Sequence, residues 1–278
     1  MNISKSLRGV ATRIRAAMAT LIGTLDGAPG GWATEEYWVR LKMRKALSDH
    51  IGLARDIERF TFDSMVRLSK PTQPQSVLMA HSALLVRTLQ DLRAAVITGM
   101  AGYTMQSWTN ASSCFEAAYT MGFIGSDSKR ADRWLAHADP SSGFVAVKDA
   151  VIGTYRYLEI GESQAERADH ADRDYGLYVR LCAGKHANPM AERHRYWVEH
   201  ADGVRLFFTP LFDRIRVRQA EFGLVIALRA TIVALLAFTR THWSREAKGD
   251  PEMVELAKRI MTLMEPWLEK DGPAAPIQ

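Results

Sequence analysis

The stretch from Leu224 to Phe238, LVIALRATIVALLAF, is the most apolar run of the chain, and its only charged residue is Arg229. A helix that crosses a bilayer needs about 20 predominantly apolar residues, and this run is shorter. We therefore interpret it as a buried core helix of a soluble protein that does not contact a membrane, and we expect a cytoplasmic location.

Apolar residues recur at helical spacing on both sides of this run. The pattern predicts helices over about 34–69 with a break near Ser48, 108–124, 129–138, 144–160, 164–184, 211–242 and 251–270. A further long helix begins at Ser76, and its predicted apolar face consists of Leu78, Ala83, Leu85, Leu89, Leu92, Val96 and Ile97. Only residues 204–208 have β character. The fold class predicted is all-α, a multi-helix bundle with at most one short β segment near 204–208.

The composition is that of an ordinary globular protein, because apolar residues make up 47% and charged residues 24%. We divide the chain into an N-terminal helical segment (1–75), a helical-bundle core (76–245) and a C-terminal helix with a disordered tail (246–278). Residues 1–25 are amphipathic, with arginines but no acidic residue. We interpret them as an ordinary first helix, and a transit peptide or membrane-surface helix is the alternative.

Two features of the composition bear on partners and compartment. The net charge of +5 leans weakly toward a polyanionic partner. The two cysteines, Cys114 and Cys182, are too few for a disulfide framework, which favours a reducing compartment.

The segment from Tyr175 to Pro189 is the one motif with clear chemical potential, since it places Arg180 and His186 near one bend at Gly184. Six residues are somewhat under two helical turns, so the two side chains are expected to face the same way. A neutral histidine can take the 2′-hydroxyl proton of RNA, and an arginine can hold a phosphate with two hydrogen bonds. Such cleavage needs no metal ion or cofactor, and we predict neither. Tyr178, Lys185 and Asn188 are predicted to bind substrate.

The spacing of Arg180 and His186 resembles the R-x4-6-H signature of the HEPN superfamily of helical-bundle proteins, although Leu181 replaces the polar residue that usually follows the arginine. That superfamily includes metal-independent ribonucleases of toxin and antiviral systems. The resemblance implies that Arg180 and His186 form the catalytic pair. It also implies a homodimer, in which two copies of the motif share one groove, and a cognate partner protein is a further expectation.

Two segments resemble more closely a group of uncharacterised, HEPN-like bacterial helical proteins. Residues 112–124, SSCFEAAYTMGFI, are similar to their pattern R-S-x-x-E-A-A-x-x-x-x-Y-I, and residues 178–186, YVRLCAGKH, to their pattern Y-x-x-L-S-x-x-x-H. The resemblance implies that Glu116 and His186 face each other across the bundle. Glu116 would then hold the imidazole of His186 in one tautomer, as the acid of a catalytic triad does.

Structural alternatives stand beside each of these interpretations. Arg180 and His186 can serve only to complete a helix C-terminus, and Glu116 can form a structural pair with an arginine or a histidine. Without catalysis, the chain would be a helical module that binds a partner protein, a nucleotide or a nucleic acid.

Other candidates lie outside this motif. Arg214, Arg216 and Arg218 can contact RNA phosphates, or they can pair with Asp213 and Glu221. Residues 166–174 contain Asp169, His170 and Asp174, which could meet a metal ion, but we interpret the segment as a solvated ion-paired face. His194 and His200 are interpreted as surface residues, and Cys182 as a free cysteine rather than a nucleophile.

Overall fold

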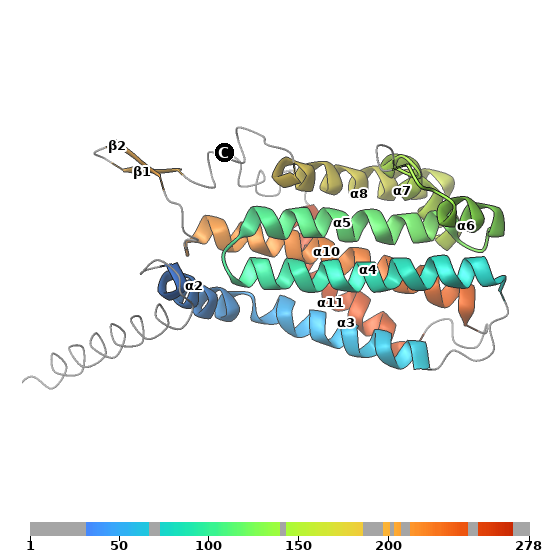
Figure 1. Cartoon of the computed structure of the whole chain (residues 1–278), viewed down its shortest axis with the longest axis horizontal. Helices are drawn as coiled ribbons and strands as arrows, with labels where there is room; N and C mark the ends of the chain where they lie inside the picture. The colour runs from blue at the N-terminus through green and yellow to red at the C-terminus, as the bar shows by residue number, and fades with distance from the viewer. Residues whose placement is uncertain are drawn as a thin grey trace, which may run out of the picture.

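The computed structural model describes residues 32–66, 73–139, 143–185, 197–200, 203–206, 212–243 and 250–268. The helices are α2 (Trp32–Ala46), α3 (Ser48–Val66), α4 (Gln75–Met100), α5 (Thr104–Ile124), α6 (Ser128–Leu135), α7 (Val147–Leu158), α8 (Gln164–Lys185), α10 (Arg214–His242) and α11 (Pro251–Leu268). They form a multi-helix bundle (Figure 1), so the predicted all-α fold class is confirmed.

A short hairpin is the only β structure among the described residues. Strand β1 (Trp197–His200) pairs antiparallel with β2 (Gly203–Leu206), with Trp197 opposite Leu206. Strand β2 covers residues 204–206 of the predicted β segment, and residues 207–208 lie outside the described part. The predicted amphipathic helix at residues 1–25 and the predicted disordered tail also lie outside it.

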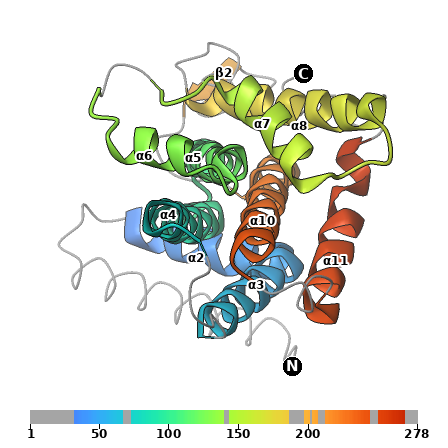
Figure 2. The same cartoon turned by 90° about the vertical axis from the view of Figure 1, so that its right-hand side faces the viewer.

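Helix α10, which contains the apolar run, packs against α3, α4, α5, α7 and α11 and lies at the centre of the bundle in Figure 2. Its 29 residues are long and apolar enough, by length and composition alone, to cross a membrane. The expectation of a length too short to cross a membrane concerned the apolar run alone, and the whole helix is longer. Since 89% of its most apolar window is buried inside the bundle, the predicted core helix is confirmed. One hydrophobic core includes Val39, residues of α10 and Trp267, so all three predicted regions contribute to it.

Helix α4 buries part of the predicted face: Leu85, Leu89 and Leu92 are buried, and Leu78 and Val96 are half-buried. Ala83 and Ile97 are exposed, and Ile97 is 56% exposed. Residues spaced by three and four around Leu85 form the buried face, and Ala83 and Ile97 lie off this stripe. The buried residues of α4 are Val77, Ala80, His81, Leu84, Leu85, Thr88, Leu89, Leu92, Ala95 and Gly99.

Two histidines meet inside the bundle. His81 of α4 and His242 of α10 are 0% and 5% exposed, and Nε2 of His242 lies 3.2 Å from Nδ1 of His81. The outer nitrogens, Nε2 of His81 and Nδ1 of His242, have no hydrogen-bond partner among the described residues. Burial and the neighbouring His242 lower the pKa of His81 to about 3, and burial lowers the pKa of His242 to about 4. Both rings are therefore neutral at physiological pH.

A buried ionic network joins four helices. Asp174 of α8 is 1% exposed and accepts hydrogen bonds from Nε of Arg229 of α10 at 2.9 and 3.2 Å. The hydroxyl of Tyr155 of α7 donates to the same carboxylate at 2.6 Å, and so does that of Tyr119 of α5. Burial raises the pKa of both tyrosines, so both remain protonated donors. The predicted solvated face of residues 166–174 is therefore wrong at Asp174, whose partners lie far away in sequence.

Helices α5 and α7 approach each other closely at Gly122. Thr154 of α7 donates its hydroxyl to the carbonyls of Tyr119 and Ala150 at 2.9 and 2.8 Å. A Cβ atom at position 122 would lie 2.4 Å from Cγ2 of Thr154. The contact thus requires glycine on α5, and it holds α7 where Tyr155 can reach Asp174.

Candidate functional site

Three of the predicted site residues meet between α5 and α8. Oε1 of Glu116 accepts a hydrogen bond from the hydroxyl of Tyr178 at 2.8 Å and one from Nζ of Lys185 at 2.7 Å. The side chains of Glu116 and Lys185 are 31% and 36% exposed, so the ion pair lies at the surface. We name Glu116, Tyr178 and Lys185 the Glu116 cluster. The expected structural partner of Glu116 was an arginine or a histidine, and its described partners are instead a tyrosine and a lysine.

Helix geometry and ring stacking explain why Tyr178 and Lys185 point to α5. Seven residues are close to two helical turns, so both side chains lie on one side of α8. The ring of Tyr178 stacks on Phe115, with 5.2 Å between the ring centroids. Burial raises the pKa of Tyr178, as do its hydrogen bonds to Cys182 and Glu116. Tyr178 is therefore a proton-bearing donor that orients the Glu116 carboxylate.

Arg180 lies apart from this cluster. It follows Tyr178 by two residues, which is about 200° around the helix, and it is exposed. The structure therefore does not bring Arg180 and Glu116 together within the chain. Helix α8 continues through the predicted break at Gly184 and ends at Lys185. His186 and Asn188 lie outside the described residues, so the predicted contact between Glu116 and His186 is untested.

The basic residues that begin α10 are largely paired. Asp213 accepts a hydrogen bond from the backbone N–H of Arg216 at 2.8 Å and forms an ion pair with the guanidinium of the same residue. Arg218 pairs with Glu221 at 3.1 Å, and its guanidinium lies over the ring of Trp267. The ion-pair interpretation is confirmed for Arg216 and Arg218. Arg214 is exposed, and its role in substrate binding stays a prediction.

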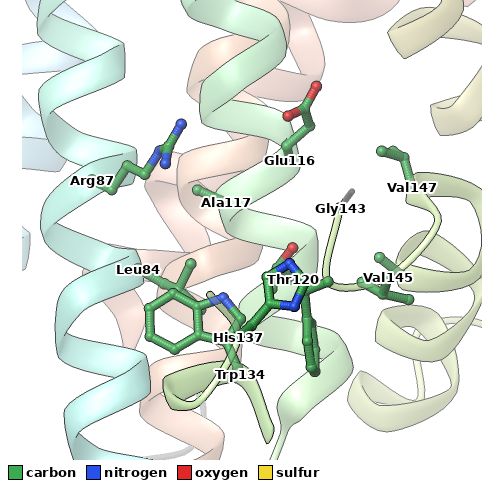
Figure 3. Close-up of a pocket in the computed structure, with 12 residues that line it drawn as sticks. Leu84, Arg87, Glu116, Ala117, Thr120, Trp134, His137, Gly143, Val145 and Val147 are labelled. Carbon is green, nitrogen blue, oxygen red and sulfur yellow. The ribbon is translucent and has the colours of Figure 1, made fainter. Parts of the chain in front are cut away.

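A pocket of about 290 Å³ opens beside Glu116 (Figure 3). Arg87 of α4 reaches toward α5 at one end, and Trp134 of α6 and His137, which follows that helix, lie at the other. Between them the walls are mostly apolar, and Thr120 of α5 adds a hydroxyl. Glu116 belongs to both the pocket and the Glu116 cluster. Sequence reasoning missed Arg87, Trp134 and His137, because α4 and the end of α6 are far apart in sequence and only packing brings them to one pocket.

The described residues form no site for metal binding or for a nucleophilic cysteine. No group of three histidines, cysteines or carboxylates there could hold a metal ion, and the buried carboxylate of Asp174 is paired with Arg229. Both cysteines are free thiols, and burial raises the pKa of Cys114 to about 12. Cys182 is half-buried. His194 and the side chain of His200 lie outside what the structure describes.

No family model, curated protein or solved structure matches the chain.

Proposed function

We propose that this chain is a HEPN-like protein that binds RNA and cleaves it without a metal ion. One observation carries the proposal: the two segments that bear the resemblance, 112–124 and 178–186, meet at the Glu116 cluster. These segments are separated in sequence by more than fifty residues, and their side chains converge on one carboxylate. Such convergence is what a shared site on α5 and α8 requires.

In this proposal each residue has a distinct task. His186 takes the 2′-hydroxyl proton of RNA and later returns a proton to the leaving oxygen. Arg180 binds the phosphate and stabilises the charge that develops in the transition state. Tyr178 and Lys185 fix the Glu116 carboxylate, which positions His186 next to the end of α8. Asn188 and the exposed Arg214 contribute to substrate binding.

The outward position of Arg180 supports the proposed homodimer. Arg180 is exposed, and so is its neighbour Val179 at 50%. In a two-fold pairing of two α8 helices, two copies of Arg180 would line one groove, where a strand of RNA can lie. A bacterial defence or toxin role in the cytoplasm, with a cognate partner protein that restrains the activity, is the biological setting we propose.

The test is an RNA cleavage assay in excess EDTA with purified wild type, Arg180→Ala and His186→Ala. The matched control is Arg173→Ala, which removes an exposed arginine from the same helix. Wild type and Arg173→Ala are expected to cleave RNA, whereas both other variants lose at least about a hundredfold in rate, the usual contribution of general acid–base catalysis. Equal cleavage by His186→Ala, with the fold verified by circular dichroism, would refute the proposal.

A non-catalytic binding module is the second candidate, and the geometry of the Glu116 cluster favours it. Lys185 already neutralises Glu116, and Arg180 points away from both. A module of this kind would bind RNA or a partner protein without turnover. Fluorescence anisotropy with labelled RNA separates the two candidates, because the module predicts saturable binding by wild type that His186→Ala leaves unchanged, with intact RNA afterwards.

A further inference from the structure

The pocket beside Glu116 has the volume for one small ligand. Its volume of about 290 Å³ lies at the lower end for ligand pockets, which span about 300–1,000 Å³. Apolar side chains of α4, α5 and α7 form its walls, among them Leu84, Ala117 and Val147. A ring inserted here would exchange water for apolar contact, and a duplex would not fit.

One end of the pocket carries aromatic groups. Trp134 lines it and is half-buried against the core, and the rings of His137 and Phe144 stand edge to face at 6.1 Å. Thr120 supplies a hydroxyl that can donate to or accept from the edge of a ring. Stacking on such side chains is the usual way in which proteins hold an unpaired nucleobase of any sequence.

The opposite end carries opposite charges. Arg87 is 64% exposed, and its guanidinium donates to Ser113 at 3.0 Å. Its Nε lies 3.6 Å from Asp91, which leaves the outer side of the guanidinium facing solvent and able to meet a phosphate. Among the described residues, both hydrogen bonds to Glu116 go to Oε1. Oε2 is therefore the oxygen that can accept a hydrogen bond from a sugar hydroxyl.

From this arrangement we infer that the pocket holds one unpaired ribonucleotide, with its base against Trp134, its 2′-hydroxyl donating to Glu116 and its phosphate on Arg87. The inference rests on the proposed RNA function for the source of the nucleotide. It also predicts that the pocket prefers RNA to DNA, because DNA has no 2′-hydroxyl that could donate to Glu116. The rest of the strand would lie along the surface of α5 toward the Glu116 cluster.

The experiment measures equilibrium binding of fluorescein-labelled hexanucleotides, U6 and dU6, to the full chain carrying His186→Ala, so that U6 stays intact, with AMP as a competitor. This reference chain is expected to bind U6 at least about tenfold more tightly than dU6, because a hydrogen bond to a charged acceptor is lost with DNA. Trp134→Leu should weaken U6 binding about tenfold or more, and Trp134→Phe should restore most of it.

Arg87→Gln should lower the slope of log K against log salt by about 0.7, the value for one phosphate contact. Arg93→Gln removes an arginine of α4 that pairs with Glu58 on α3, and serves as the unchanged control.

The outcomes separate this inference from the proposed function. If wild type cleaves RNA but Trp134→Leu and Arg87→Gln bind and cleave U6 as wild type does, the pocket inference is wrong and the cleavage proposal stands. If AMP competes and the variants behave as expected while RNA stays intact, the pocket inference stands and the cleavage proposal fails. Saturable binding of free apolar amino acids, without binding of U6, would overturn the inference and assign the pocket to a zwitterion held between Arg87 and Glu116.

Discussion

Mild acid should destabilise this protein through the buried histidine pair. The native pKa values of His81 and His242 are lowered to about 3 and about 4, whereas an unfolded histidine titrates at about 6.5. At pH values between the folded and unfolded pKa values, the two histidines bind protons in the unfolded chain but not in the folded chain. Stability is therefore fully present above pH 6.5 and is lost as the pH falls from 6.5 toward 4.

The magnitude follows from the same values. At pH 5.5, one pH unit below the unfolded pKa, each histidine that stays neutral in the folded state costs about 1.4 kcal/mol relative to pH 7.5. The pair therefore costs about 3 kcal/mol, a large part of the 5–15 kcal/mol that holds a typical domain together. Burial also lowers the pKa of His50, whose shift adds to the loss in the same direction.

Urea unfolding followed by circular dichroism at pH 7.5 and pH 5.5 measures this loss. The double variant His81→Leu/His242→Leu keeps apolar bulk in the core and should lose about 3 kcal/mol less than wild type between the two pH values. His137→Gln, which removes an exposed histidine, should retain the wild-type loss. An equal loss in wild type and the double variant would refute the reasoning. If the double variant does not fold, NMR titration of the wild-type rings decides: a ring of His81 or His242 that titrates between pH 7.5 and 5.5 would contradict it.

Two further substitutions test the packing that positions α7 and α8. Asp174→Asn leaves Arg229 without its charged partner and should lower the free energy of unfolding, measured with urea, by about 3–5 kcal/mol. Asp172→Asn, at an exposed ion pair on the same helix, should lower it by less than about 1 kcal/mol. Similar losses in both variants would contradict the buried network. Gly122→Ala should cost about 1–3 kcal/mol by steric overlap with Thr154. Much of that loss should disappear in the Thr154→Ala background, and a loss that persists there would show that the contact is not its cause.

Much of the fold was predictable because local signals specify helices. The apolar run predicted the core helix α10, and the break expected near Ser48 separates α2 from α3. The apolar face of α4 was predictable only in part, since Ala83 and Ile97 are apolar but lie away from the core. An apolar side chain is able to be buried, but the positions of the neighbouring helices decide which side of α4 they cover.

Long-range pairs were beyond the reach of one sequence. Asp174 lies in a charge-rich run that is typical of a solvated surface, and only Arg229, on another helix, explains its burial. Glu116, Tyr178 and Lys185 were each selected from motifs, but their direct contact was not foreseen. The pocket combines Arg87, Trp134 and Glu116 from three helices, a combination that depends wholly on how those helices pack.

The central position of α10 also bears on how the chain is synthesised. Helix α4 is complete at Met100, and α10 is complete only at His242. At about 5–20 residues per second, a ribosome needs roughly 7–30 s to add the residues between them. During that interval the faces of α4 and α5 that pack on α10 have no covering helix. A nascent chain of this protein is therefore expected to be a substrate for chaperones that shield apolar surfaces, until its last long core helix emerges.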